Sequence, residues 1–371
     1  MLVWRVCSLW KGVAVGSYLA ALTFELLTEN CTIMAPSRLK MALIGCGSIA
    51  QAHWAGIQRI AKRVDVTAVV DKDPAALEAM VGRTQADGFA EIDEALAIGD
   101  FDAVDIMLPH ALHEHAALIC FAAGKHVLLE KPIAHNLESA ERILRAGRKA
   151  GSTFMIAEQS QYWPDVVAAR QLIDDRAIGD AIAASGNFYD RIPVDWGVSP
   201  PWRYDLAISG GGVTIDGGAH WIRPLRMMMG EISEVIGIAG THQPMMEGES
   251  WSRTLMKFES GSAGVLNCQN YAHAAGPADL FRVTGTKGEL LITPGRQGGL
   301  VLYNDSFPKG EIIMNGFEGR RDSYGEEIKN FSEVILDGAA MAASPEFSLG
   351  ELRTALALYA SIKSGRWEKV W

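Results

Sequence analysis

The pattern of apolar and polar residues changes character partway along the chain, near Gln159. Before that point, short aliphatic runs alternate with longer segments that carry helical periodicity. The runs predict strands at Met41–Ile44, Val64–Val70, Ala103–Leu108, His126–Leu129 and Thr153–Ala157. The segments between them predict helices at Ser48–Ala61, from Asp73 and Pro74 onward, at His113–Ala123 and at Leu137–Ala150. Strands that alternate with helices at this spacing are typical of a parallel sheet with helices on both faces.

After Gln159 the apolar runs follow one another more closely. A helix is predicted at Pro164–Arg176, a strand at Ala181–Tyr189 and a helix at Val213–Met229. Five further strands are then expected at Glu234–Ala239, Arg253–Glu259, Gly264–Asn270, Leu280–Thr284 and Glu289–Thr293. Turn dipeptides such as Ser260-Gly261 and Lys287-Gly288 separate them, which favours an antiparallel sheet. Two helices, at Tyr324–Leu336 and Leu349–Ser364, close the chain.

The first part of the chain shows neither the alternation of strands and helices nor the closely spaced strands. Met1–Lys11 carries two positive charges and Gly12–Phe24 is apolar, a pattern like a short signal-peptide core. A true start at Met34, just before the first strand, is the interpretation that we favour, and an extra N-terminal helix is a further alternative. We therefore expect three regions: an extension at 1–37, a doubly wound parallel-sheet domain at 38–158, and an α+β domain with an open, mostly antiparallel sheet at 159–371. The protein is expected in the cytoplasm unless residues 1–33 act as a signal.

Composition narrows the classes of partner. The 371 residues are 49% hydrophobic and 21% charged, and the formal net charge is -10 without any run of Lys or Arg. That balance argues against nucleic acid or an anionic membrane as partners, and it says little about a neutral substrate such as a sugar. The five cysteines form no C-x-x-C or Cys/His ligand spacing, so we expect a reducing compartment and no metal site.

A glycine-rich turn between the first strand and the first helix predicts dinucleotide binding. Gly45 permits the tight turn, Gly47 lets the backbone approach a pyrophosphate, and Ala50 lets the helix pack closely on the sheet. The helix start at Ser48 and Ile49 would offer N–H groups to the phosphates. Asp71 ends the second strand, where a carboxylate accepts the ribose hydroxyls and repels a 2′-phosphate. We expect NAD as cofactor, and NADP less readily.

Two further motifs carry groups suited to acid–base chemistry. Glu130-Lys131-Pro132 follows the fifth strand, whose end faces the cofactor crevice, and a Lys there can stabilise negative charge on a substrate oxygen. Glu130 is expected beside the cofactor. Asp216 and His220 stand four residues apart in a glycine-rich stretch, which predicts that both lie on one face of a helix. His220 can take a hydroxyl proton near neutral pH, and Asp216 could orient it or hold a neighbouring hydroxyl.

These motifs, in this order, resemble the glucose–fructose oxidoreductase/inositol dehydrogenase (Gfo/Idh/MocA) family. The resemblance runs from about Lys40 to Trp371 and includes the segments "LPHALHEHAALICFAAGKHVLLEKP", "QLIDDRAIGD", "WRYDLAISGGG" and "GTKGELLI". It implies an N-terminal Rossmann domain and a substrate domain with an open sheet. It also implies that Lys131, Asp216 and His220 are the catalytic residues, and that the substrate is a sugar, an inositol or a related polyol.

The substrate side is where the sequence departs from the family. Gln159–Pro164 stands where relatives often carry Arg or Asn before a Pro. The candidates to contact a substrate are three aromatic residues, to cover an apolar sugar face, and two arginines, to bind hydroxyls or a carboxylate: Tyr162, Trp163, Trp202, Arg191 and Arg203.

The sequence thus predicts an NAD(P)-dependent oxidoreductase that moves a hydride between its cofactor and a secondary hydroxyl or ketone of a sugar or polyol. Two alternatives remain open at this level. Some relatives are glycosidases that retain NAD and act by transient oxidation and elimination. The other alternative is a non-catalytic NAD-binding sensor or assembly protein, although such a protein need not keep Lys131, Asp216 and His220 together. The open sheet predicts a homodimer or homotetramer, because such faces are usually covered.

Overall fold

A computed structural model describes residues 38–191, 201–271, 280–293, 299–315, 320 and 322–371. The predicted extension at 1–37 lies outside these residues. Within them, no helix is both long enough and apolar enough to cross a membrane.

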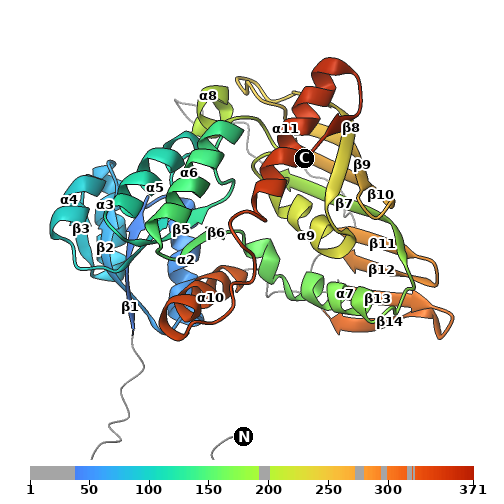
Figure 1. Ribbon diagram of the computed structural model, residues 1–371, viewed down its shortest axis with the longest axis horizontal. Helices are drawn as coiled ribbons and strands as arrows, with labels where there is room; N and C mark the ends of the chain where they lie inside the picture. Colours follow the sequence, from blue (N-terminus) through green and yellow to red (C-terminus); the bar gives the residue numbers. More distant parts are fainter. Residues whose placement is uncertain (1–37, 192–200, 272–279, 294–298, 316–319, 321) are drawn as a thin grey trace, which may run out of the picture. The chain divides into compact units, whose positions relative to one another are not determined.

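The first half of the described chain forms a six-stranded parallel sheet (Figure 1). Its strand order is β3-β2-β1-β4-β5-β6, so the chain moves outward from β1 in one direction and then, from β4, in the other. This reversal places the carboxyl ends of β1 and β4 side by side at the point where doubly wound sheets bind ligands. The strands are β1 (Leu39–Ile44), β2 (Val64–Val70), β3 (Asp87–Phe89), β4 (Ala103–Ile106), β5 (His126–Glu130) and β6 (Phe154–Ala157).

Helices cover both faces of this sheet, as the alternation of apolar runs predicted. Each face has its own buried cluster: one contains Ile44, Val104 and Ile143, and the other contains Leu43, Ile57 and Met80. The helices are α2 (Ser48–Arg59), α3 (Pro74–Thr84), α4 (Ile92–Ile98), α5 (His113–Ala122) and α6 (Leu137–Ala150). The short elements β3 and α4 were not among the predicted ones.

The second half forms a nine-stranded sheet with the order β14-β13-β12-β11-β7-β10-β9-β8-β15. All of its neighbouring strands are antiparallel except β7 and β10, which run parallel, so the sheet is mixed but mostly antiparallel, as expected. It extends further than the predicted strands, through β13, β14 and β15. The strands are β7 (Ala181–Arg191), β8 (Ile232–Gly240), β9 (Trp251–Phe258), β10 (Ala263–Tyr271), β11 (Phe281–Gly285), β12 (Gly288–Thr293), β13 (Gly299–Asn304), β14 (Phe307–Asn315) and β15 (Glu368–Lys369).

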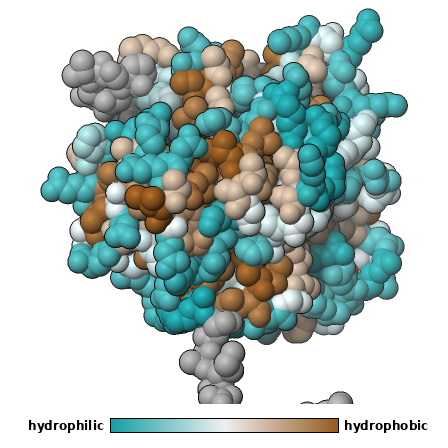
Figure 2. Space-filling model, turned by 60° about the vertical axis from the view of Figure 1, so that its left-hand side comes forward, coloured by the Kyte–Doolittle hydropathy of each residue, from teal (hydrophilic) through white to brown (hydrophobic). Residues whose placement is uncertain are grey.

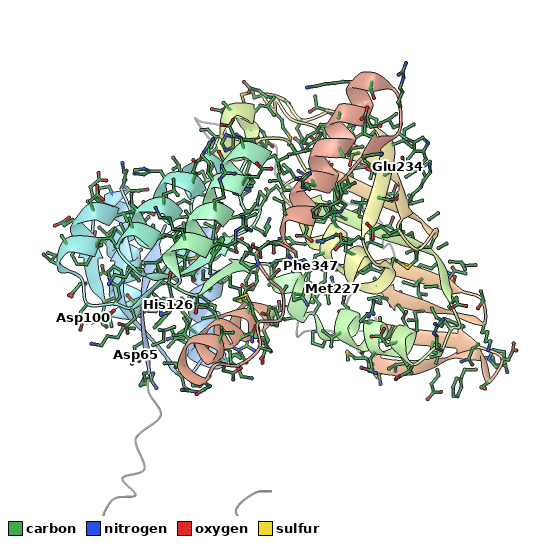
Figure 3. All side chains as sticks on the ribbon, in the orientation of Figure 1. Asp65, Asp100, His126, Met227, Glu234 and Phe347 are labelled. Carbon is green, nitrogen blue, oxygen red and sulfur yellow. The ribbon has the colours of Figure 1, made fainter. Side chains whose placement is uncertain are left out.

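Three helices cover one face of this sheet: α7 (Pro164–Asp174), α9 (Ala219–Met229) and α11 (Leu349–Ser364). Two arginines of α9, Arg223 and Arg226, are buried against Glu351 of α11 and the ring of Phe347, which is labelled in Figure 3. Removing one partner from a buried ion pair leaves an uncompensated charge, so these contacts fix α9 firmly. Because His220 lies in the first turn of α9, they also fix the position of its backbone.

The helix α10 (Ser323–Asp337) packs against the first sheet although it comes late in the chain (Figure 1). Its residues Ile328 and Phe331 are fully buried in the same cluster as Ile57 of α2. The two helices meet at glycines, since a Cβ atom on Gly56 would lie 2.6 Å from the backbone nitrogen of Gly325. The C-terminal part of the chain therefore completes the core of the first domain.

Polar residues cover most of the face drawn in Figure 2, and apolar residues gather near its middle. Exposed ion pairs such as Arg38–Asp65 and Lys40–Asp100 lie near the ends of β1 and β2, where Figure 3 labels Asp65 and Asp100. Such exposed pairs contribute little to stability.

Candidate active site

A cleft of about 640 Å³ opens at the carboxyl edge of the first sheet and is also lined by residues of the second. It brings together the three motifs that the sequence singled out. Its lining residues are Gly45, Gly47, Ser48, Ile49, Asp71, Met107, Leu108, Pro109, His110, Glu130, Lys131, Phe188, Asp190, Trp202, Arg203, Val213, Asp216, Gly217, His220, Asn270 and Tyr324.

The glycine turn has the shape that a dinucleotide needs. Gly45 has a φ of +96°, and a Cβ atom there would lie 2.5 Å from the carbonyl oxygen of Met107, so only glycine fits. A Cβ atom on Gly47, in contrast, would meet no atom within 4 Å of the described chain. Gly47 is also the N-cap of α2 and supplies no side chain to cap its N–H groups. This open space at an uncapped helix N-terminus fits a pyrophosphate.

Asp71 follows β2 and lies in the same cleft. Its Oδ2 accepts a hydrogen bond of 2.7 Å from the backbone N–H of Cys46, and its Oδ1 accepts one of 2.8 Å from that of Asp73. The carboxylate is thus fixed against the glycine turn. In this position it can accept ribose hydroxyl groups and would repel a 2′-phosphate.

Lys131 and Asp216 form the charged centre of the cleft. The Lys131 ammonium donates to the backbone oxygen of Asp216 at 2.9 Å and to its Oδ1 at 3.1 Å, and Arg203 Nε donates to Oδ2 at 2.7 Å. Burial alone would raise the pKa of Asp216, but the charges of Lys131 and Arg203 outweigh it and hold that pKa well below its usual range. Asp216 is therefore a carboxylate that keeps the Lys131 ammonium in place.

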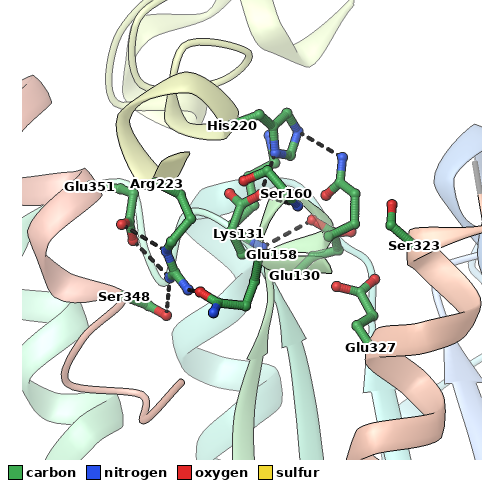
Figure 4. A network of polar contacts seen from close by, with 12 residues as sticks. Glu130, Lys131, Glu158, Ser160, His220, Arg223, Ser323, Glu327, Ser348 and Glu351 are labelled. Atoms are coloured by element: carbon green, nitrogen blue, oxygen red, sulfur yellow. Dashed lines mark hydrogen bonds and ion pairs between the residues drawn. The ribbon is translucent and has the colours of Figure 1, made fainter. Parts of the chain in front are cut away.

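His220 is held by a different carboxylate, that of Glu158 (Figure 4). The His220 Nδ1–H donates to Glu158 Oε1 at 2.7 Å, and the side chain of Glu158 is 1% exposed. Burial alone would raise the pKa of Glu158, but the charges of His220, Arg223 and Lys131 lower it to about 2. An ionised Glu158 can only accept, so the proton of a neutral His220 sits on Nδ1 and the lone pair sits on Nε2.

The expectation that Asp216 and His220 share one helical face is wrong. The helix α9 begins only at Ala219, and Asp216 lies in the turns before it. Gly217 and Gly218 separate the two residues. A Cβ atom on Gly217 would lie 2.2 Å from the ring of Phe188, so this position requires a glycine in a close-packed turn. As a result Asp216 binds Lys131, and Glu158 rather than Asp216 orients His220.

Two amide oxygens in and beside the cleft are buried without a hydrogen-bond donor among the described residues: Asn270 Oδ1 and Gln159 Oε1. Asn270 lies near the end of β10 and lines the cleft. Gln159 begins the 3₁₀ turn η2 (Gln159–Tyr162), and its Nε2 is 3.4 Å from Nε2 of His220 and 3.2 Å from the hydroxyl of Tyr324. Buried acceptors of this kind are usually satisfied, so these atoms suit a ligand that carries hydroxyl groups.

His110, in the turn η1 (His110–Leu112) after β4, adds a neutral imidazole to the cleft. Its Nδ1–H donates to the carbonyl oxygen of Ser209 at 2.8 Å, at the end of α8 (Leu206–Ser209), so its Nε2 carries a lone pair. Burial lowers the pKa of His110 to about 3, despite the nearby charge of Asp216. The Nε2 atom lies 3.9 Å from Asp216 Oδ1, and the ring of Trp202 packs edge-on against the imidazole.

Only some of the residues predicted to contact the substrate reach the cleft. Trp202, in the turn η3 (Trp202–Tyr204), lines it together with Arg203, whose guanidinium lies 4.4 Å above the Trp202 ring. Trp163 instead is 4% exposed and packs in the second core against Trp221. The Tyr162 hydroxyl donates to Asn330 of α10, so neither of these aromatic residues covers the cleft. Arg191 ends β7, and its side chain lies outside the described residues.

The sequence motifs did not reveal Glu158, His110, Asp190 and Asn270. A signal was present for most of them, because Glu158 follows β6 directly, His110 follows β4, and Asp190 and Asn270 lie near the ends of the paired strands β7 and β10. Polar residues at the carboxyl ends of the strands of a doubly wound sheet face its ligand crevice. The position of Glu158 could therefore have been inferred, but its contact with His220 depends on the second domain.

The dinucleotide cradle and the acid–base groups that face it define the class of this protein, an NAD-binding oxidoreductase. Comparison with known families gives the same answer in more detail. Residues 39–158 match the oxidoreductase family with an NAD-binding Rossmann fold, and residues 166–291 match the GFO/IDH/MocA C-terminal domain. The chain belongs to the Gfo/Idh/MocA family of oxidoreductases.

Several proteins are similar to this chain over most of its length. An inositol 2-dehydrogenase of Arthrobacter sp. is 28% identical over 81% of this chain and 86% of its own length. A levoglucosan dehydrogenase of Pseudarthrobacter phenanthrenivorans is 25% identical over 68% of this chain and 75% of its own length. The crystal structure of an NAD binding oxidoreductase from Klebsiella pneumoniae superposes with a TM-score of 0.80 at 27% identity, covering 90% of this chain and all of that one.

Proposed function

We propose that this protein oxidises a secondary hydroxyl of a cyclic polyol or sugar with NAD, or reduces the matching ketone. The observation that carries the proposal is the Glu158–His220 pair, which lies across the same cleft as the Lys131–Asp216 pair. The first pair supplies a base and the second supplies a fixed cation. Oxidation of a hydroxyl-bearing carbon uses both, one to take the hydroxyl proton and one to stabilise the charge left on the oxygen.

His220 is the proton acceptor in this proposal. Because Nδ1 donates to Glu158, Nε2 carries the lone pair, and it lies 3.4 Å from the amide nitrogen of Gln159, which a substrate hydroxyl would replace as the donor. When Nε2 takes the proton from the substrate hydroxyl, the imidazole becomes a cation, and the buried carboxylate of Glu158 stabilises that charge. Glu158 thus sets both the tautomer and the orientation of the base, which is the role of the carboxylate in other His–carboxylate pairs.

Lys131 stabilises the oxygen that loses its proton. Its ammonium is held at Asp216 and is only 12% exposed, so it need not reorganise when negative charge develops on the substrate. The bound cofactor supplies the hydride chemistry, and the groups that would hold it are Gly45, Gly47 and Asp71.

The chemistry of the cleft supports a polyhydroxyl substrate. Asn270 and Gln159 offer buried acceptors, while Arg203 offers donors and Trp202 an apolar ring. This combination suits a molecule with hydroxyl groups on one side and C–H bonds on another. The names of two similar proteins, an inositol 2-dehydrogenase and a levoglucosan dehydrogenase, fit that class.

NAD is favoured over NADP in this proposal. The Asp71 carboxylate lies where the adenosine ribose would bind. The 2′-phosphate of NADP would therefore lie close to this negative charge, and the repulsion between them would weaken NADP binding. Lys72, the neighbouring cation, forms an exposed ion pair with Glu91 at 3.4 Å. It therefore lies toward α4 rather than toward the glycine turn.

A panel assay tests the function directly. Purified protein is mixed with NAD and with myo-inositol, levoglucosan, D-xylose or other polyols in turn, and NADH absorbance is followed. Reduction of NAD by at least one polyol, faster with NAD than with NADP, is the expected result. Release of free sugar from a glycoside without net NADH, or no turnover with any polyol or sugar, would contradict the proposal.

We further propose that a second copy of the chain covers the open face of the nine-stranded sheet. The strand register places six aliphatic residues in one row across that face, interrupted only by Ser185 and Arg282: Ile236, Leu255, Val265, Leu291, Val301 and Ile312. Leu255 is 52% exposed and Ile312 is 58% exposed. Apolar rows of this kind on sheets commonly mark an interface.

Light scattering tests the interface. Leu255→Glu should shift the protein to a smaller species, whereas Ile98→Glu, at an even more exposed apolar position on α4, should not. A parent protein that is monomeric at micromolar concentration would contradict this part of the proposal.

A further inference from the structure

Four ionisable side chains meet in the core of the first domain, behind the cleft. They come from four different elements: His53 from α2, Asp105 from β4, Glu130 from β5 and Glu327 from α10. His53, Asp105 and Glu327 are fully buried, and Glu130 is 6% exposed. Burying this much charge is costly unless it is paired, so the arrangement calls for a function.

His53 lies at the centre of this cluster and has a carboxylate at each ring nitrogen. Its Nδ1 is 2.7 Å from Asp105 Oδ2, and its Nε2 is 3.1 Å from Glu130 Oε1. Ionised carboxylates only accept hydrogen bonds, so both nitrogens donate and the ring is an imidazolium. Burial alone would lower the pKa of His53, but Asp105 and Glu130 outweigh it and raise that pKa well above its usual value.

Glu327 is the third carboxyl group beside this imidazolium. Its Oε1 is 3.5 Å from His53 Nε2, and neither of its oxygens has a hydrogen-bond partner among the described residues. Burial raises the pKa of Glu327 well above its usual value, as do the charges of Glu130, Asp105 and Glu158, and only His53 opposes them. Burial and the neighbouring carboxylates thus favour the neutral acid form of Glu327, whose carboxyl group lies beside Glu130, toward which it points in Figure 4.

The cluster is continuous with the proposed catalytic groups through Glu130. One oxygen of Glu130 bonds to His53, and the other accepts the backbone N–H of Lys131 at 2.9 Å. The Lys131 side chain then reaches Asp216. His53 itself lies six residues after Gly47, on the helix whose N-terminus forms the phosphate cradle. One imidazolium thus connects the cofactor helix to the strand end that carries Lys131.

We propose that His53 is a positioning residue: by holding Glu130 against Asp105, it fixes the backbone of Lys131 relative to the cradle at the start of α2. The inference rests on the proposed function, because its main readout is turnover of a polyol. A displacement of about 1 Å at a catalytic group can cost on the order of 10²-fold in rate, so a positioning residue has a measurable effect.

Substitutions at His53 and Glu327 test the proposal, with His126→Gln as the control. His126, labelled in Figure 3, begins the same strand, β5, at the end opposite to Glu130, and its Nδ1 accepts the backbone N–H of Thr153. His53→Gln should lower kcat on the order of 10²-fold while KM for the polyol changes little. Glu327→Gln keeps the shape and the neutral charge of the acid and should retain most of the turnover, whereas Glu327→Ala should not. His126→Gln should leave kcat as in the parent.

A measurement that does not need a substrate accompanies the kinetics. In ¹⁵N-histidine NMR spectra, the resonances that vanish in His53→Gln should be those of an imidazolium at pH 8. Failure of the proposed function would appear as a parent that turns over no polyol, whatever the spectra show. An active parent with an equally active His53→Gln variant, or a neutral His53 ring, would overturn the positioning role. So would a stoichiometric metal ion that is lost in Glu327→Gln, because Glu327 would then be an ionised ligand.

Discussion

Glu158 and His220 form a buried pair, with Nδ1 of the imidazole 2.7 Å from Oε1 of the carboxylate, although 62 residues separate them in the chain. Asp216, only four residues before His220, does not take this part. It binds Lys131 and Arg203 instead. The base and the cation of the proposed site therefore each have their own carboxylate, and the two charge pairs can be disturbed independently.

Removal of either proposed catalytic side chain should lower turnover strongly and leave cofactor binding intact. His220→Ala removes the proton acceptor, a loss of about 10²–10⁴-fold in rate. Lys131→Met removes the charged donor to the substrate oxygen, a loss on the order of 10²–10³-fold. NAD affinity, measured by calorimetry, should stay near that of the parent, since Gly45, Gly47 and Asp71 are unchanged. Near-parent rates in either variant would disprove its catalytic role, and loss of NAD binding in both would indicate a structural one.

Glu158 should matter for stability as well as for rate, with a defined dependence on pH. The pKa of Glu158 is lowered from 4.5 to about 2, so the ionised carboxylate stabilises the folded state above pH 4.5, and this contribution is lost as the pH falls toward 2. Glu158→Gln should therefore have a lower Tm than the parent near pH 6, and the difference should shrink on acidification. A difference in Tm that is constant from pH 6 to pH 3 would contradict the assignment. Turnover should fall about tenfold or more, because the amide can stabilise no imidazolium.

The two glycines of the cradle should respond differently to alanine. Gly45→Ala places a Cβ atom 2.5 Å from Met107 in a left-handed backbone conformation, so its Tm should fall clearly. Gly47→Ala places the Cβ atom in open space, so the protein should fold normally but bind NAD about tenfold more weakly or worse, because the methyl group occupies the place of the pyrophosphate. Thermal melts and NAD titrations measure both effects. Normal NAD affinity in Gly47→Ala would mean that the phosphates lie elsewhere.

Asp71 should decide between the two cofactors. Replacement by Ser removes the charge that would face a 2′-phosphate and also the acceptor of the Cys46 N–H. We expect Asp71→Ser to weaken NAD binding and to strengthen NADP binding, so that the ratio of the two affinities falls by about tenfold or more. Competitive titration of the two cofactors measures the ratio. If the ratio does not change, Asp71 does not face the adenosine ribose.

His110 should affect the substrate rather than the cofactor. Its Nε2 and Asp216 Oδ1 are two acceptors 3.9 Å apart, and a substrate hydroxyl placed near both can donate to either. His110→Phe retains the ring that packs on Trp202 but loses the acceptor. We expect kcat/KM for the best polyol to fall about tenfold, at unchanged NAD affinity. An equal loss of NAD affinity would place His110 on the cofactor side of the cleft.

The sequence predicted the first domain well because each of its signals is local. An apolar run, a glycine turn and a helix start occupy neighbouring positions between Met41 and Ala50, and the structure places β1, the turn and α2 there. The order of motifs also brought Lys131, Asp216 and His220 to one cleft, as the family resemblance implied.

The predictions from sequence were wrong where contacts between distant segments determine how a side chain is oriented or buried. A spacing of four predicted a helical Asp216–His220 pair, but the helix begins only at Ala219. Gly217 lies in the turn before it, where Phe188 of β7 leaves no room for a side chain. Trp163 looked like a sugar-binding residue because aromatic residues suit both a core and a ligand face. Only the packing against Trp221 places it in the core. The pairing of Glu158 with His220 has no local signal at all, because the two residues lie in different domains.

Because α10 comes late in the chain, the core of the first domain can be completed only near the end of synthesis. The ribosome finishes the six strands of the first sheet by Ala157, yet Ile328 and Phe331, which fill the same core as Ile57, emerge more than 150 residues later. Until then the nascent first domain exposes an apolar surface on α2, and such surfaces are prone to aggregate or to recruit chaperones. Residues 38–158, which contain the whole cradle for the dinucleotide, therefore lack part of the packing of their own core until the last helices have been made.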